Sequence, residues 1–94
     1  MADVVLVQPK VGDWDRVRSH PAIPLALLAA ARVVAKEFTV KFIDMRVSPN
    51  WKERLLAELK EKPLCAGITS LTGRQIKYAM EVSRLIKQHS DVPV

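Results

Sequence analysis

Three short apolar runs, each followed by a segment with helical character, constrain the fold of this chain more than any other feature. The runs lie at residues 4–7, 39–44 and 64–70. Short runs rich in β-branched residues are typical of strands buried in a parallel sheet. Because strands and helices alternate three times along the chain, the sequence predicts an α/β fold with right-handed crossovers.

The first two helices are predicted from proline positions and apolar spacing. Residues 24–36 begin with Pro24, which suits a first helical turn, and continue with strong helix formers. This helix is apolar almost all round, so it should pack on a sheet and be covered again by a second surface. Ser48 and Pro49 predict the cap and first turn of the second helix. One face of that helix carries four apolar residues: Trp51, Leu55, Leu56 and Leu59.

The third helix is predicted by a capping box, with Thr72 at the cap and Gln75 three residues later. Four residues at helical spacing form its expected inner face: Ile76, Met80, Ser83 and Ile86. Residues 92–94 then resemble the first residues of a fourth strand. We therefore expect one α/β domain over residues 1–94, with a Rossmann-like (flavodoxin-like) parallel sheet, flanking helices and an incomplete C-terminal end.

The ends of the three expected strands carry the polar candidates for a binding site. Gln8 and Pro9 end the first strand, Asp44 ends the second, and residues 69–72 follow the third. In open parallel sheets, ligands bind outside the carboxyl ends of the strands. We therefore expect these residues to line one edge where a ligand binds.

A long irregular segment at residues 10–22 follows the first strand and contains Trp14 and His20. Long loops inside compact domains are often functional. Trp14 either anchors the loop on the core or stacks on a ligand. His20 is either an exposed loop histidine, which we favour, or a ligand or acid–base group. The other histidine, His89, is expected to be solvated near a helix C-terminus.

Several common chemistries are excluded by missing motifs. The glycines of a dinucleotide-binding G-x-G-x-x-G loop are absent after the first strand, so Asp44 is more simply a structural cap or surface acid than a ribose ligand. A P-loop is also absent. A phosphoacceptor receiver domain would need acidic residues where Gln8 and Thr69 stand. We identify no catalytic residue and no metal-ligating residue in the sequence.

The composition and the single cysteine bear on the cellular location of the protein and on the classes of partner that it binds. Cys65 cannot form an internal disulfide or a multi-thiolate metal site, and we expect it to be a packed core thiol. The N-terminus has no signal-peptide pattern, and the interrupted apolar run at residues 23–34 is too short to span a membrane. A net charge of +5 shared by both halves, with 5% aromatic residues, argues against nucleic-acid and membrane partners. We expect a cytoplasmic protein.

The order of short motifs along the chain resembles one protein family. Five segments carry the resemblance: the strand ending in Gln8 and Pro9, the loop that follows it, the helical segment 24–30, the residues 42–44 and the segment 66–72. They are similar to the amino-terminal cobalamin-binding domain of cobalamin-dependent radical SAM enzymes. The resemblance covers essentially the whole chain. One departure is Leu25-Ala26, which stands where the family's P-x-G-L segment has a glycine.

The resemblance implies that this chain binds cobalamin base-off, since the D-x-H-x-x-G histidine loop of mutase-type domains is missing. Gly67, Ala29 and Ala30 would give room for the nucleotide tail of the cofactor. Ordinary close packing explains any one of these small residues equally well. The cofactor-binding residues implied in this way are Gln8, Pro9, Lys10, Trp14, His20, Thr69, Ser70, Leu71 and Thr72.

The resemblance also implies that this chain alone is not the catalyst. A radical SAM iron–sulfur cluster needs three cysteines, so the cluster and S-adenosylmethionine would belong to a catalytic barrel C-terminal to this chain. The whole enzyme would be of the methyltransferase or cyclase type. The isolated domain would bind cobalamin weakly or undetectably and would tend to self-associate through its open sheet edge and uncovered helix. The alternative is a cofactor-free α/β scaffold or protein-interaction domain.

Overall fold

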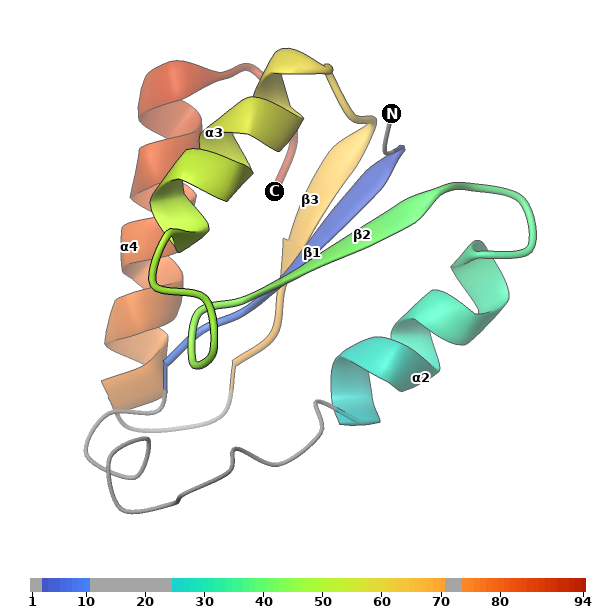
Figure 1. Cartoon of the computed structure of the whole chain (residues 1–94), viewed down its shortest axis with the longest axis horizontal. Coiled ribbons are helices and arrows are strands. Elements are labelled where there is room, and N and C mark those ends of the chain that lie inside the picture. Colours follow the sequence, from blue (N-terminus) through green and yellow to red (C-terminus); the bar gives the residue numbers. More distant parts are fainter. Residues whose placement is uncertain (1–2, 11–24, 71–73) are drawn as a thin grey trace.

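The computed structural model describes residues 3–10, 25–70 and 74–94 of the chain (Figure 1). No helix within these ranges is long and apolar enough to cross a membrane. Strands and helices alternate along them in the order β1 (Val4–Gln8), α2 (Leu25–Val34), β2 (Val40–Asp44), α3 (Trp51–Lys60), β3 (Cys65–Ile68) and α4 (Arg74–His89).

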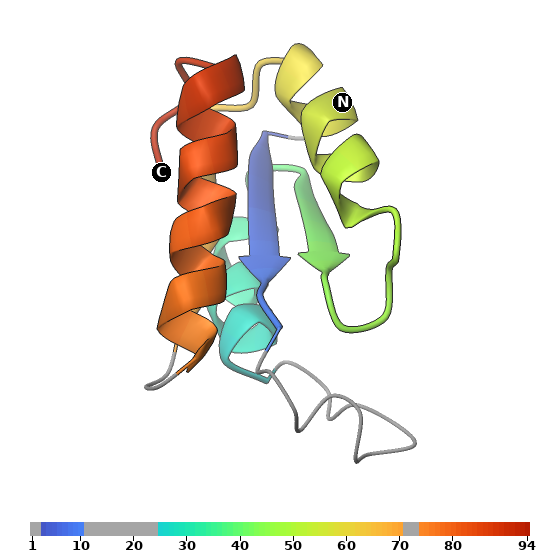
Figure 2. The same cartoon turned by 90° about the vertical axis from the view of Figure 1, so that its left-hand side faces the viewer.

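The three strands form one parallel sheet in the order β2-β1-β3. Val4 of the central strand lies opposite Val40 on one side and Cys65 on the other. The chain passes from β1 to β2 through α2 and returns across β1 to β3 through α3, which lies on the opposite face (Figures 1 and 2). Helices change face in this way when successive crossovers have the same hand. The expected Rossmann-like α/β architecture is confirmed.

The hydrophobic core lies between the sheet and the two helices α3 and α4. Side chains alternate between the two faces of a strand, and Val5 and Val7 of β1 point toward these helices and are completely buried. Leu55 of α3 and Ile86 of α4 are completely buried against them. The rest of this cluster consists of Ile43, Met45, Trp51, Leu59, Ala66, Val82 and Val92.

The other face of the sheet is covered by α2 alone among the described helices, and only in part (Figure 1). Only two of the described α2 side chains, Leu27 and Ala31, are buried, whereas Leu28 and Val33 are exposed. Leu6 of β1, which points to this side, is half-buried. The prediction that α2 packs on the sheet is confirmed, but no described part of the chain covers its outer face.

Cys65 corrects one expectation, because it is exposed and is not a core thiol. It lies opposite Val4 at the amino end of β3, so its side chain points to the face that α2 only partly covers. Because successive side chains of a strand point to opposite faces, the side chain of the next residue, Ala66, points into the core.

We expect the thiol of Cys65 to react with a soluble thiol reagent in the native chain almost as fast as in urea, because no side-chain packing has to open first. Stopped-flow absorbance with a disulfide reagent measures both rates. A native rate lower by orders of magnitude would contradict the exposed position of Cys65.

The inner face of α4 also differs from the prediction. Ile86 is buried as expected, but Ile76 and Met80 are 49% and 50% exposed. Gln75 and Val82 occupy the buried face instead. The sequence places apolar residues on two adjacent flanks of this helix, and the sheet, which ends at β3 within the described residues, lies under only one of them.

The start of α3 differs as well. The helix begins at Trp51 with Asn50 as its N-cap, so the prediction of Ser48 and Pro49 as cap and first turn is wrong. The Ser48 hydroxyl instead accepts a hydrogen bond of 2.9 Å from Nη1 of Arg54. Residues 45–47 and 49–50 form turns, so the helix begins two residues later than predicted.

The segment at residues 92–94 lies beside β3 as predicted, although it has no strand conformation. The backbone N–H of Ala66 donates to the carbonyl of Pro93 at 2.8 Å, and Val92 is buried in the core. This hydrogen bond is formed on the side of β3 away from β1, where a fourth strand would pair.

Candidate functional site

The carboxyl ends of the strands meet at one edge, as predicted. Gln8 at the end of β1 lies directly opposite Asp44 at the end of β2. The N–H of Met45 donates to the Gln8 carbonyl at 2.9 Å, which continues this pairing beyond β2. The N–H of Thr69 donates to the Val7 carbonyl at 3.3 Å. The ends of β2 and β3 therefore lie on either side of the end of β1, each in the neighbouring strand position.

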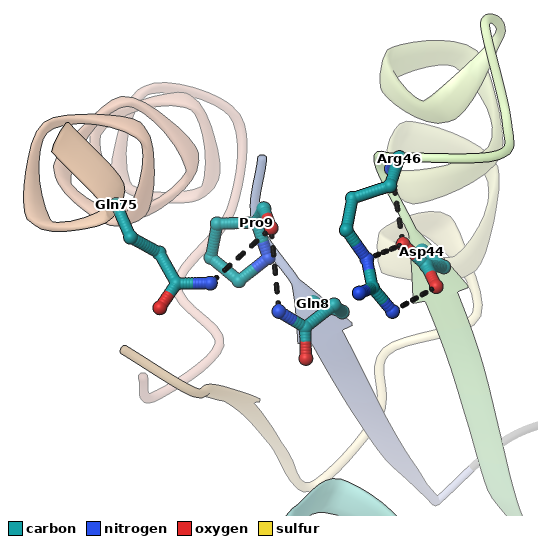
Figure 3. A network of polar contacts seen from close by, with 5 residues as sticks. All are labelled: Gln8, Pro9, Asp44, Arg46 and Gln75. Atoms are coloured by element: carbon teal, nitrogen blue, oxygen red, sulfur yellow. Dashed lines mark hydrogen bonds and ion pairs between the residues drawn. The ribbon is translucent and has the colours of Figure 1, made fainter. Parts of the chain in front are cut away.

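Two buried glutamines converge on one carbonyl at this edge (Figure 3). Gln8 is 8% exposed and Gln75 is 2% exposed, and they are the buried polar residues among those the structure describes. Nε2 of Gln8 donates to the Pro9 carbonyl at 3.3 Å, and Nε2 of Gln75 donates to the same oxygen at 3.4 Å. Gln75 lies at the start of α4, so this oxygen joins β1 to α4.

Asp44 is engaged by Arg46 through a bidentate ion pair (Figure 3). Oδ1 of Asp44 accepts from the backbone N–H of Arg46 at 3.0 Å and from its Nε at 2.9 Å, and Oδ2 accepts from Nη2 at 2.8 Å. The Arg46 side chain is only 9% exposed. The interpretation of Asp44 as a structural cap is confirmed, because its carboxylate fixes the turn after β2.

The remaining described residues of this edge present polar groups to solvent. Lys10 and Ser70 are exposed, and Thr69 is half-buried. Arg74 is exposed at the start of α4. The other residues implied as cofactor contacts lie outside the described residues: Trp14, His20, Leu71 and Thr72.

Gly67 permits a close contact on the α2 side of the sheet. A Cβ atom at this position would lie 2.8 Å from Cδ2 of Leu6, which is closer than real Cβ contacts. Gly67 is half-buried, whereas Ala29 and Ala30 are exposed on α2. Close packing with Leu6 therefore accounts for the glycine, and the surface around it is only partly covered.

The other singled-out side chains have structural environments. Trp51 is a buried core residue with Nζ of Lys52 5.5 Å from its ring centroid. His89 is exposed, and its Nδ1 lies 2.9 Å from the carbonyl oxygen of Leu85. The part of the chain that the structure describes contains no group of three or more His, Cys, Asp or Glu residues that could hold a metal ion.

The ion pair of Arg46 with Asp44 and the hydrogen bond from Gln75 to the Pro9 carbonyl were not identified from the sequence. The Asp44-x-Arg46 spacing carries a local signal, because an aspartate followed by a turn often caps the backbone two residues later. Gln75 was assigned only to a capping box, and its bond to Pro9 joins residues 66 positions apart. No local pattern indicates such a contact.

Comparisons with known proteins identify no protein similar to this chain. No protein-family model, no curated protein and no solved structure matches the chain.

Proposed function

We propose that this chain is a cobalamin-binding module that holds the cofactor base-off at the carboxyl edge of its sheet. In this proposal, a radical SAM barrel outside the chain carries the catalytic iron–sulfur cluster and S-adenosylmethionine. The observation that carries the proposal is the meeting of Gln8, Asp44 and Thr69 at one edge, next to a sheet face that α2 leaves partly open.

The chemistry of this edge fits the cofactor. A corrin ring is a broad apolar disc with amide groups at its rim, and it needs hydrogen-bonding groups and a wide surface at the strand ends. The hydroxyl groups of Thr69 and Ser70 can bond amides, and exposed Lys10 can pair with the phosphate of the nucleotide tail. The half-buried surface around Gly67 and Leu6 offers an apolar wall for that tail. Bound cobalamin would supply cobalt for alkyl transfer, and these residues would bind and orient it.

Titration with hydroxocobalamin tests the proposal. We expect weak binding by the chain alone, because the barrel that would cover the other side of the ring is not part of it. The absorbance spectrum of cobalamin should change to that of the base-off form as protein is added at millimolar concentration. A spectrum that stays unchanged with folded protein would contradict the proposal.

Leu71→Asp should abolish this spectral change, because the family resemblance implies that Leu71 lies under the corrin ring, where a charge would be desolvated without a partner. Leu64→Asp is the matched control, since Leu64 is 60% exposed at the opposite end of β3. The control should bind cobalamin as the unmodified chain does. Equal binding by both variants would exclude Leu71 as a contact.

A second candidate, a protein-interaction domain, is favoured by the exposed apolar side chains. Leu28 and Val33 on α2, and Ile76 and Met80 on α4, are exposed on opposite sides of the sheet. Apolar surface of this kind often marks contacts between proteins. In the proposed enzyme the same surfaces would contact the barrel domain, so the two candidates differ in whether cobalamin binds.

We expect the isolated chain to self-associate as its concentration rises, because these apolar surfaces lack cover from its described residues. Sedimentation velocity measures the change in size with concentration. Leu28→Lys combined with Val33→Lys should reduce the association, whereas Lys36→Ala, just after the same helix, should not. A monomer at all concentrations would count against this prediction.

A further inference from the structure

We infer that Gln75 is a positioning residue that fixes the carbonyl of Pro9 and thereby holds the end of β1 against the start of α4. This inference deepens the proposed function and depends on it for the identity of the ligand. The contact itself depends only on the structure, in which Gln75 Nε2 donates to the Pro9 oxygen at 3.4 Å (Figure 3).

The burial of Gln75 is the first argument. An amide taken out of water costs free energy unless it is hydrogen-bonded, and an apolar side chain of the same length would fill the site without that cost. Gln75 is nevertheless among the most completely buried side chains that the structure describes. A buried polar side chain whose hydrogen bonds are made favours one packing arrangement of the surrounding elements more than it raises the stability of the fold.

The second argument is that both buried glutamines donate to the same acceptor. Pro9 has no N–H, so its carbonyl is its sole backbone polar group. Gln8 reaches this carbonyl from the adjacent position in the chain, whereas Gln75 reaches it from a different element. Of these two bonds, the one from Gln75 therefore joins two different elements, because it ties the end of β1 to the start of α4.

The lengths of these bonds set the expected size of the effect. Distances of 3.3 and 3.4 Å lie beyond the usual range for N–H···O bonds, so each bond is weak. Loss of the Gln75 bond should leave the melting temperature almost unchanged. Its effect should appear in the placement of Lys10, which follows Pro9 after the end of β1, and of Arg74, the first residue of α4.

Gln75→Met tests the inference, because methionine has a similar length and no donor. We expect cobalamin binding to weaken by about threefold to tenfold, as the loss of the hydrogen bond to the Pro9 carbonyl implies. Gln88→Met is the matched control on the exposed side of the same helix and should bind as the unmodified chain does. Equal affinity for both variants would overturn the positioning role.

A readout independent of cobalamin tests the contact itself. In the free protein, NMR should show slower exchange of the Gln75 side-chain amide protons than of those of Gln88. Gln75→Met should shift the carbonyl carbon resonance of Pro9 upfield, and Gln88→Met should not. Fast exchange at Gln75 or an unchanged Pro9 resonance would overturn the inference. If the contact is present and the unmodified chain still does not bind cobalamin, the proposed function is wrong and the contact stands on the NMR result.

Discussion

Leu55→Ala and Ile86→Ala should each lower the free energy of unfolding by about 2–5 kcal/mol. Both side chains are completely buried in the cluster between the sheet and the helices α3 and α4. Each change removes apolar contacts and leaves a cavity that the flanking strands cannot fill. In a chain this small, such a loss is a large share of the total stability.

Urea unfolding followed by circular dichroism measures this loss. Leu64→Ala is the control, because Leu64 is exposed and its truncation should change stability by about 0.5 kcal/mol or less. Equal losses for all three variants would contradict the position of the core on the α3 and α4 side.

Asp44→Ala should lower the free energy of unfolding by about 3 kcal/mol, because it leaves the largely buried Arg46 guanidinium without its carboxylate. It also removes the acceptor of the Arg46 backbone N–H. The double variant Asp44→Ala/Arg46→Met should regain part of the loss, since it removes the buried charge together with its partner.

The exposed ion pair of α3 and α4 gives the control for Asp44→Ala. Nζ of Lys52 lies 3.6 Å from Oε1 of Glu81, and both side chains are about half exposed. Lys52→Ala should therefore cost less than about 1 kcal/mol. Asp44→Ala and Lys52→Ala are compared in the same urea experiments. If both lowered the free energy of unfolding by the same small amount, the buried Arg46 ion pair would not be what stabilises the turn after β2.

The alternation of strands and helices was predictable because three short, largely apolar runs are each followed by a segment with helical character. Val5 and Val7 show why the runs had to be strands, since both are completely buried in the core of a parallel sheet. The carboxyl edge was predictable for a related reason. Parallel strands end at the same edge, so Gln8, Asp44 and Thr69 had to lie near one another once the sheet was assumed.

The faces of the helices and the edge strand were not predictable with the same certainty. Ile76 and Met80 have the spacing of a buried face, but the sheet lies under the flank that carries Gln75 and Val82. Cys65 lies in the apolar first part of the run at residues 64–70, and its exposure follows from the limited reach of α2. The exposure of these side chains depends on the width of the sheet and on which helices cover it. No local sequence pattern specifies either of these.

The contacts that organise the candidate site were partly hidden for the same reason. Asp44 and Arg46 lie two residues apart, and a turn-capping pattern could have been recognised there. The bond from Gln75 to Pro9 joins distant parts of the chain, so only the folded structure brings its donor and acceptor together.

Mapping cobalamin by NMR on the labelled chain tests the central claim most directly. Hydroxocobalamin at millimolar concentration should shift the backbone amide resonances of Gln8, Asp44 and Thr69 at the carboxyl edge of the sheet. The resonances of Asp3 and Thr39, which hydrogen-bond to each other at the amino edge, should stay unchanged. Absence of any shift, or shifts centred on the amino edge, would contradict the account.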